Sequence, residues 1–378
     1  RGALCGVPRS EGWVGRSEAG ESRRLWRRQR QRRWRGPPCP TMSAPAVVAA
    51  AAGYVAVCLA AWLLGRSGAG PPPKRTVEIA RGVHMPLLAN GVDTDHHVWL
   101  EAGGRHLDTA FLYGDWKQRA VGAAIASSGL PRGDVFLTTK VMCCPTLRCG
   151  GVCEGGTTAP VAVNAATYRN VTAQLEHSLS VLGLPSVDLL LLHFPCARWA
   201  DTAAAWRALE RAHAAGHARA IGVSNFNASL LRRLVKIAAI QPAVNQVGFS
   251  IAGHPAEHGG ENATRYGCLE GSRLYGADDA TLRLATARGI TTQAYSPLGA
   301  ISNVDVLGRR EVQRVAAAHS REGGARNWTA AQVAFAWLLQ QGMGAVTATT
   351  DARHAAEALD AAELRLTRRE MRSLSRLR

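Results

Sequence analysis

The stretch Gly103–Gly114, reading GGRHLDTAFLYG, decides the fold prediction. Arg105, Leu107 and Thr109 alternate with His106 and Asp108 as on the two faces of a β-strand, and the strand runs into Asp108 and then Tyr113. Barrel enzymes carry their reactive groups at the carboxyl ends of parallel strands, so a strand that ends on a carboxylate and a phenol is a candidate catalytic strand. An Asp at a strand end is more often a turn or cap residue, and the prediction therefore depends on how the later strands end.

From Thr76 onward the chain repeats short apolar runs and helical stretches, with a hairpin predicted around Arg81–Gly82. The predicted strands are Pro86–Asn90, Arg105–Thr109, Asp134–Val141, Val187–His193, Ala218–Ser224, Ala243–Phe249, Ile290–Tyr295 and Gly344–Thr349. The predicted helices are a short Asp95–Ala102, then Gln118–Ser127, Ala165–Leu182, Thr202–Ala215, Ser229–Ala239, Asp279–Arg288, Arg310–His319 and Thr329–Gln340. This alternation predicts an α/β fold, a (β/α)8 TIM barrel over 76–378, and the lack of Gly-x-Gly-x-x-Gly after the first strand argues against a Rossmann fold.

The net charge of +17 is unevenly spread along the chain. Residues 1–41 hold eleven Arg and three Glu, which is +8 of the total. No basic stripe with interleaved aromatic residues follows, so we expect no nucleic-acid partner. Residues 1–43 have no periodicity and are predicted to be a disordered basic arm, unless translation begins at Met42.

The uncharged run 44–65 is long enough to span a bilayer and precedes a Gly/Pro linker over 66–75. It predicts a signal anchor or a signal peptide, with a buried soluble helix as the alternative. Four glycosylation sequons begin at Asn170, Asn227, Asn262 and Asn327. The sequons favour a lumenal domain held by a membrane tether, with a glycan expected at Asn262. Basic residues directly after the run favour a cytosol-facing domain if the anchor is not cleaved.

Later strands also end on polar residues. Lys140 closes the strand DVFLTTK, and His193 closes VDLLLLH. For His193 alone a satisfied core or cap histidine would be the favoured interpretation. A Lys and a His that close strongly apolar strands are costly unless they face a polar site, so Asp108, Tyr113, Lys140 and His193 together predict one catalytic site.

The motifs LDTAFLYG, TTK, LLLLHFP, IGVSNF, PAVNQV and AYSPLG follow one another in order. On these motifs the chain resembles the aldo-keto reductase family over Val77–Met371. The resemblance implies hydride transfer from NADPH, or NADH, to the carbonyl of a small aldehyde, ketone or sugar, without a metal. We expect a small-molecule substrate and a monomer.

The resemblance assigns a role to each of the four polar residues. Tyr113 would be the general acid, although a free phenol has a pKa of about 10. Lys140 would favour the phenolate, and Asp108 would keep Lys140 charged and in place. His193 would donate a hydrogen bond to the substrate carbonyl.

The resemblance also implies where the cofactor and the substrate bind. Ser224, Asn225 and Gln246 would meet the nicotinamide carboxamide, and Tyr295 would stack on the ring. The cofactor pyrophosphate would lie against the loop that contains Ser296 and Leu298. The other predicted cofactor contacts are Thr349, Arg353, His354 and Glu357, of which Arg353 or His354 could meet the 2′-phosphate. The candidates for the substrate pocket are Phe194, Trp116 and Trp199, for which core packing is an equal alternative.

The chain departs from the family pattern in several places. Ala348 stands where a Lys usually contacts the 2′-phosphate of NADPH, which leaves NADH open while the family pattern favours NADPH. The first helix is short, and the usual tail loop is lacking, so the substrate is not specified. The insert after the third strand contains Cys143, Cys144, Cys149 and Cys153. A disulfide-stapled loop, free thiols and a zinc site are the alternatives for these cysteines.

Two classes of function remain after this comparison of motifs. The intact catalytic set favours an active reductase. The altered phosphate contacts and the short first helix leave a cofactor-binding regulatory or sensor protein as the alternative. Turnover would separate the two.

Overall fold

The computed structural model describes residues 76–92, 94–143, 163–196, 198–254, 278–299, 304–322 and 326–378. The strands are β1 (Thr76–Ala80), β2 (Val83–Pro86), β3 (Leu88–Asn90), β4 (His106–Asp108), β5 (Phe136–Val141), β6 (Val187–Leu192), β7 (Ala218–Ser224), β8 (Val244–Gly248), β9 (Thr291–Tyr295) and β10 (Gly344–Thr347). The α-helices are α3 (His96–Glu101), α4 (Asp115–Ser127), α5 (Val163–Leu182), α6 (Trp199–Ala214), α7 (Ala228–Ile237), α8 (Asp279–Ala287), α9 (Arg310–Glu322), α10 (Ala330–Gln340), α11 (Ala352–Asp360) and α12 (Arg368–Leu374).

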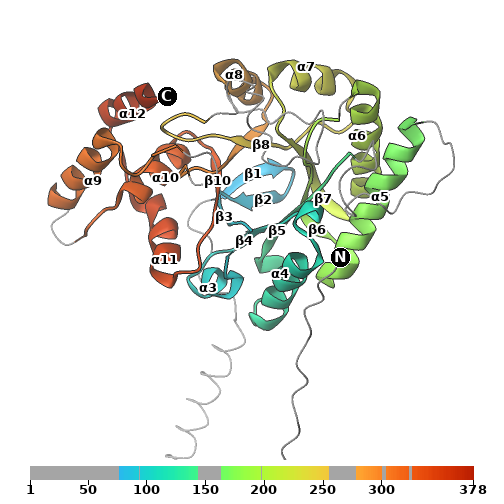
Figure 1. Ribbon diagram of the computed structural model, residues 1–378, viewed down its shortest axis with the longest axis horizontal. Helices are drawn as coiled ribbons and strands as arrows, with labels where there is room; N and C mark the ends of the chain where they lie inside the picture. The colour runs from blue at the N-terminus through green and yellow to red at the C-terminus, as the bar shows by residue number, and fades with distance from the viewer. Residues whose placement is uncertain are drawn as a thin grey trace, which may run out of the picture. The chain divides into compact units, whose positions relative to one another are not determined.

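Strands β3 to β10 close into a barrel with the order β10-β3-β4-β5-β6-β7-β8-β9, and every neighbouring pair is parallel. β1 and β2 form a separate antiparallel hairpin, which Figure 1 shows in the middle of the ring of strands. The barrel, the hairpin and the short first helix are confirmed. Helices α11 and α12 were not among the predicted helices.

Side chains of alternate strand residues point into the barrel, and their chemistry changes along each strand. On β6, Leu189 and Leu191 belong to an apolar cluster inside the barrel, and the same parity leads to His193. On β5, the parity of the buried Phe136 leads through Thr138 to Lys140. The inward face is therefore apolar near the amino ends of the strands and polar at their carboxyl ends.

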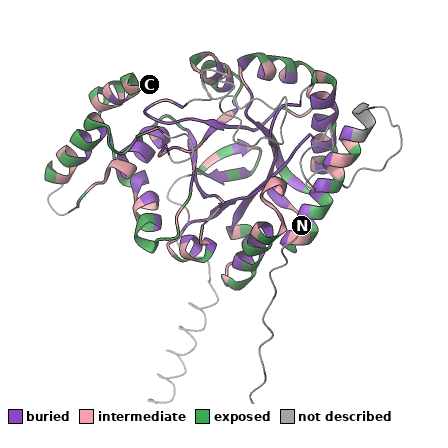
Figure 2. Cartoon of the chain, viewed as in Figure 1, coloured by how far each residue is buried: buried purple, intermediate pink, exposed green. Residues whose placement is uncertain are grey.

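Two apolar clusters fill the two sides of the strands. The larger one lies between the strands and the surrounding helices, where Figure 2 shows buried residues on the inner side of the helices. The smaller one lies inside the barrel and includes Ile79, Val83 and Met85 of the hairpin, so the hairpin closes the amino end of the barrel. The carboxyl end is thus the end at which polar groups gather.

Several sequence predictions fall outside the described residues. They concern the basic arm over 1–43, the run 44–65, the linker over 66–75, the sequon at Asn262, and the three later cysteines of the insert. Among the helices that the structure does describe, none combines the length and apolarity needed to cross a bilayer.

Candidate active site

A buried ion pair occupies the ends of β4 and β5. The Lys140 ammonium contacts Oδ1 of Asp108, and it also donates a hydrogen bond to the backbone oxygen of Thr109 at 3.0 Å. The Lys140 side chain is fully buried, and only 3% of the Asp108 side chain is exposed. Because an isolated buried ammonium would be very costly, this geometry places a compensated positive charge inside the barrel mouth.

Tyr113 and His193 lie beside this ion pair. Tyr113 ends the short 3-10 turn Phe111–Tyr113, and Nζ of Lys140 is 5.2 Å from the centroid of its ring. The ring of His193 meets the Tyr113 ring edge to face, with 5.8 Å between the centroids. The structure thus brings together all four residues that the sequence predicts to be catalytic.

Burial lowers the pKa of His193 well below its ordinary value, and the positive charge of Lys140 lowers it further. The imidazole is therefore neutral at physiological pH and carries one N–H donor. Its Nδ1 is buried and has no hydrogen-bond partner among the described residues. An unpartnered polar atom at a site otherwise rich in hydrogen bonds is a candidate contact for a ligand.

The ends of β7, β8 and β9 continue the polar ring. Tyr295 donates from its hydroxyl to Oδ1 of Asn225 at 2.8 Å, and Nδ2 of Asn225 donates to Oγ of Ser224 at 3.1 Å. Ser224 in turn donates to the backbone oxygen of Gln246 at 2.8 Å. Nε2 of Gln246 donates to Oδ2 of Asp108, also at 2.8 Å. These bonds connect the four predicted nicotinamide contacts to the Asp108–Lys140 pair in one network.

Two residues after the strands have left-handed backbone conformations. Asn225 has φ +61° and Ser296 has φ +51°. Asn tolerates this conformation better than most residues, and here it lets Nδ2 of Asn225 donate to the backbone oxygen of His193 at 3.0 Å. The turn after β9 is tight, since the amide of Gly299 donates to the Ser296 oxygen at 3.0 Å, and half-buried Leu298 lies within this turn.

The loop after β10 differs from a simple phosphate cradle. Asp351 caps α11, and its Oδ1 accepts from the amides of Arg353 at 2.8 Å and His354 at 3.1 Å. These hydrogen bonds lower the pKa of Asp351, with the His354 amide as the largest favourable contribution. A negative charge therefore already occupies the amide groups of this helix end. Thr349 is half-buried and accepts from the Asp351 amide, and Glu357 is half-buried within α11.

The three aromatic candidates for the substrate pocket have different surroundings. Phe194 is buried and stacks on the His193 ring at 4.3 Å between centroids. Trp116 is 68% exposed and borders a cavity of about 40 Å³ that also touches Asp108, Thr94 and His96. Trp199 packs against the outer core, and the guanidinium carbon of Arg233 is 4.2 Å from its ring centroid. Phe194 and Trp116 therefore lie beside the predicted catalytic residues, whereas Trp199 packs against the outer core.

Three residues that contribute to the candidate site and its surroundings were not predicted from the sequence. Gln293 of β9 accepts from Gln246 at 2.8 Å, Asp351 caps α11, and Cys196 forms a disulfide with Cys143. A disulfide was one of the alternatives for Cys143, but its partner lies outside the insert. The inward parity of Gln293 and the helix-cap position of Asp351 are signals that the sequence contains. No three potential metal ligands cluster within the described part of the chain.

A model of the Aldo/keto reductase family matches residues 92–378. An aldo-keto reductase of Mycolicibacterium vanbaalenii is 33% identical over 279 residues, which cover 74% of this chain and 80% of that protein. A 9,11-endoperoxide prostaglandin H2 reductase of Trypanosoma cruzi is 30% identical over 311 residues, which cover 80% of this chain and 90% of that protein. The chain therefore belongs to the aldo-keto reductase family, a family of NAD(P)H-dependent carbonyl reductases.

A solved structure supports the fold. The Bombyx mori aldo-keto reductase, crystallised in complex with NADP, has a TM-score of 0.62 and 23% identity, with 82% of this chain and 94% of that chain covered. The similarity extends over nearly the whole relative. The protein is thus an aldo-keto reductase oxidoreductase on a TIM barrel.

Proposed function

We propose that this protein reduces the carbonyl group of a small aldehyde, ketone or sugar, with Tyr113 as the general acid. The observation that carries the proposal is the continuous network from Tyr295 through Gln246 to the Asp108–Lys140 pair. This network joins the residues expected to hold the nicotinamide to those expected to move the proton. A reductase needs both functions within one site.

The residues present fit a nicotinamide. Ser224, Asn225 and Gln246 offer both amide donors and oxygen acceptors at one end of the barrel, which a carboxamide requires. Gln293 adds a buried Nε2 that has no partner among the described residues. The nicotinamide, when bound, supplies the hydride. The half-buried ring of Tyr295 is the proposed stacking surface.

The protein's own groups supply the proton and the orientation. The neutral His193 donates a hydrogen bond to the substrate carbonyl and holds it near Tyr113. As the carbonyl carbon accepts hydride, its oxygen gains negative charge and takes the proton from the Tyr113 hydroxyl. The nearby Lys140 ammonium stabilises the phenolate that remains, and Asp108 keeps this ammonium charged and fixed.

The choice between the two cofactors depends on the loop after β10. We propose that NADPH binds, as the family pattern favours, with exposed Arg353 and His354 as the available partners of the 2′-phosphate. The Asp351 carboxylate opposes this binding, because it accepts hydrogen bonds from the backbone amides of Arg353 and His354 and so places a negative charge beside them. The chain should therefore discriminate only weakly between NADPH and NADH.

Cofactor titration followed by turnover tests the proposed function. Purified protein is titrated with NADPH and NADH by fluorescence, and the loss of reduced-cofactor absorbance is then followed with a panel of aldehydes, ketones and sugars. The Tyr113→Phe variant should bind cofactor with nearly unchanged affinity and lose at least about 100-fold in turnover, because only the proton donor is removed. Substantial residual reduction in this variant would exclude Tyr113 as the acid.

The second candidate function is a cofactor-binding sensor. The negative charge of Asp351 at the phosphate end and the six-residue α3 favour it. Tight cofactor binding without turnover on any carbonyl would support the sensor and exclude the reductase. The intact set of four residues favours the reductase.

For the cellular location we propose a lumenal barrel tethered through 44–65, and we propose that it acts as a monomer. The buried Cys143–Cys196 disulfide supports an oxidising compartment. Asn327 is exposed, whereas the side chain of Asn227 caps α7 by accepting from the Leu230 amide at 3.0 Å. Glycans are therefore proposed at Asn262 and Asn327, and an unmodified protein from a secretory host would contradict the lumenal placement.

A further inference from the structure

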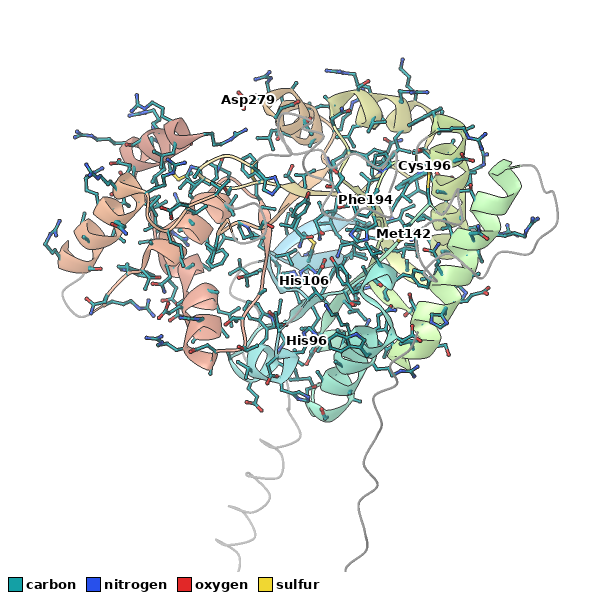
Figure 3. The ribbon with its side chains drawn as sticks, viewed as in Figure 1. His96, His106, Met142, Phe194, Cys196 and Asp279 are labelled. Atoms are coloured by element: carbon teal, nitrogen blue, oxygen red, sulfur yellow. A yellow bond between two sulfur atoms is a disulfide. The ribbon has the colours of Figure 1, made fainter. Side chains whose placement is uncertain are left out.

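The Cys143–Cys196 disulfide joins the two strands that carry Lys140 and His193. Cys143 follows Lys140 by three residues, and Cys196 follows His193 by three residues. The two Cα atoms are 5.5 Å apart, and both cysteines are buried. Figure 3 labels Met142, Phe194 and Cys196 in one region of the view, and Phe194 stacks on the His193 ring.

This covalent bond continues the pairing of β5 with β6 beyond its last paired residues. The register ends at Val141 and Leu192, and the amide of His193 donates to the Val141 oxygen at 2.8 Å. The disulfide connects the two segments just beyond this last hydrogen bond, on the carboxyl side of both strands. It therefore restrains the relative position of the strand ends at the point where the backbone ladder stops.

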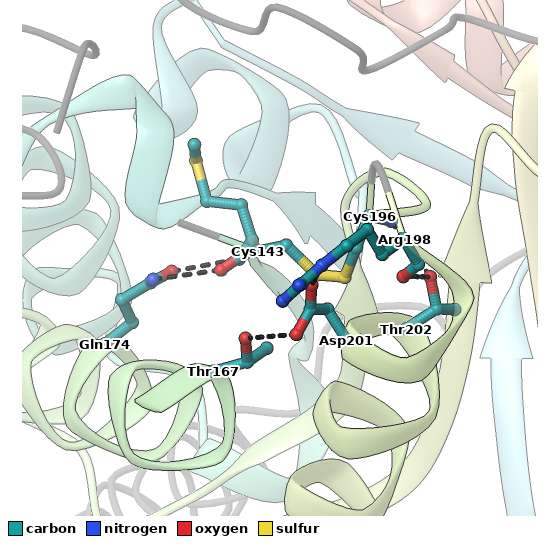
Figure 4. Close-up of a disulfide and its surroundings, with 8 residues drawn as sticks. Cys143, Thr167, Gln174, Cys196, Arg198, Asp201 and Thr202 are labelled. Atoms are coloured by element: carbon teal, nitrogen blue, oxygen red, sulfur yellow. Dashed lines mark hydrogen bonds and ion pairs between the residues drawn. A yellow bond between two sulfur atoms is a disulfide. The ribbon is translucent and has the colours of Figure 1, made fainter. Parts of the chain in front are cut away.

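Neighbouring helices hold each half of the disulfide, as Figure 4 shows. The side chain of Gln174 on α5 accepts from the Met142 amide at 2.9 Å and donates to the Met142 oxygen at 3.0 Å. On the other side, the Cys196 amide donates to Oγ1 of Thr202 on α6 at 3.0 Å. Gln174 thus anchors the residue before Cys143, and Thr202 anchors Cys196 itself.

We propose that the Cys143–Cys196 disulfide is a positioning element for Lys140 and His193, so that turnover depends on its oxidation state. This inference rests on the proposed reductase function. Lys140, which stabilises the Tyr113 phenolate, and His193, which orients the carbonyl, come from different strands and must keep their mutual geometry, and a displacement of about 1 Å costs up to about 100-fold in rate. The proposed nicotinamide contacts come from β7, β8 and β9, which the disulfide does not join. Opening the bond should therefore affect turnover more than cofactor binding.

The redox step is an ordinary thiol–disulfide exchange. A dithiol reductant attacks the disulfide to form a mixed disulfide, and its second thiol then releases both cysteines as thiols while the reagent becomes oxidised. Two electrons pass from the reagent to the two sulfur atoms. A low-molecular-weight disulfide such as oxidised glutathione reverses the exchange and is itself reduced to two thiols.

The experiment compares the full chain before and after reduction with dithiothreitol, with free thiols counted in both states. The probe is an aromatic aldehyde that the oxidised protein reduces, and NADPH affinity is measured by fluorescence. We expect kcat to fall about tenfold or more on reduction, the NADPH Kd to change less than about twofold, and oxidised glutathione to restore kcat. The Cys143→Ser/Cys196→Ser variant should match the reduced protein in both buffers. Cys268 is a cysteine outside the described residues and apart in sequence from both halves of the disulfide, and a Cys268→Ser control should keep the redox response of the unmodified chain.

Two results would overturn the inference alone. One is a reduced protein whose two thiols are free but whose kcat is unchanged. The other is a parallel loss of kcat and NADPH affinity, which would indicate general loosening of the barrel rather than positioning. If the double variant does not fold, the reduced and oxidised forms of the unmodified chain still decide the question. Absence of turnover in the oxidised protein would overturn the proposed function, and the inference with it.

Discussion

Asp108 and Asp188 are carboxylates buried on barrel strands at opposite ends of the barrel, and their partners differ. Asp108 at the carboxyl end pairs with Lys140, whose side chain is completely buried. Asp188 near the amino end accepts from Arg132 at 2.9 Å and Arg219 at 2.8 Å, whose side chains are 31% and 47% exposed. Both arginines remain partly in contact with water, so their charges lose little hydration free energy when they bind Asp188. The Lys140 side chain has no contact with water, so its charge is held at a high desolvation cost. Charges retained at such a cost cluster at functional sites.

Removal of the buried lysine should produce the largest effect. Lys140→Met should lower kcat about 1,000-fold, because the phenolate of Tyr113 loses its stabilising charge. It should also destabilise the fold, because Asp108 is left buried without a cation, and the Asp108→Asn/Lys140→Met variant should recover much of that stability. Steady-state kinetics and urea unfolding measure the two effects. A kcat within tenfold of the unmodified protein would show that the carboxyl-end pair is as structural as the amino-end pair.

Acid should destabilise the barrel through two buried histidines. Burial lowers the pKa of His106, inside the barrel, and of His254, after β8, from 6.5 to about 4. Between pH 6.5 and about pH 4 the unfolded chain binds more protons at these histidines than the folded chain does. Stability is therefore full above pH 6.5 and falls as the pH drops toward 4, by up to about 3 kcal/mol for each group.

Urea unfolding at pH 7 and pH 5 measures this loss. The imidazole of His106 bonds to the Pro86 oxygen at 2.7 Å and to Thr138 Oγ1 at 2.9 Å, and a Gln side chain offers similar groups. His106→Gln should therefore reduce the difference in stability between the two pH values. An unchanged difference would assign the acid sensitivity to other groups.

Loss of the amino-end carboxylate should affect stability but not turnover. Asp188→Ala removes the acceptor of the Leu137 amide, at 2.9 Å, and leaves that buried donor unsatisfied. The expected cost is about 2 kcal/mol of unfolding free energy, with kcat changed less than about twofold. Arg219→Ala, which removes only a partly exposed partner, should cost less than about 1 kcal/mol. A large loss of kcat in Asp188→Ala would contradict the separation of the two ends.

The smallest expected effect concerns a third carboxylate, Asp351, at the end of α11. Asp351→Ser keeps a capping oxygen but removes the negative charge. The ratio of NADPH to NADH affinity should then rise about threefold, as measured by fluorescence titration. Asp351→Asn, which also removes the charge, is the matched control and should shift the ratio in the same direction. An unchanged ratio in both variants would place the 2′-phosphate away from this helix end.

The barrel and the proximity of Asp108, Lys140 and His193 could be predicted from the sequence for a simple reason. Asp108 and Lys140 lie near the carboxyl ends of β4 and β5, and His193 directly follows β6. The strands have a fixed inward parity, so these three side chains converge once the eight parallel strands close. The disulfide was different. Cys143 and Cys196 are 53 residues apart, and their pairing depends on the register of β5 with β6. The second bond of Asp108, to Gln246, likewise depends on a side-chain conformation that no local pattern specifies.

The hairpin of β1 and β2 closes the amino end of the barrel. Ile79, Val83 and Met85 fill the amino end of the barrel. Within the described part of the chain, the cofactor and substrate of the proposed reaction are therefore expected to enter and leave at the carboxyl end. The molecule that binds deeper in the barrel has to bind first and dissociate last. The network from Tyr295 to Asp108, which is proposed to hold the nicotinamide, lies at the depth of the strand ends. The protein should consequently handle its reactants in a compulsory sequence, which product-inhibition patterns would display.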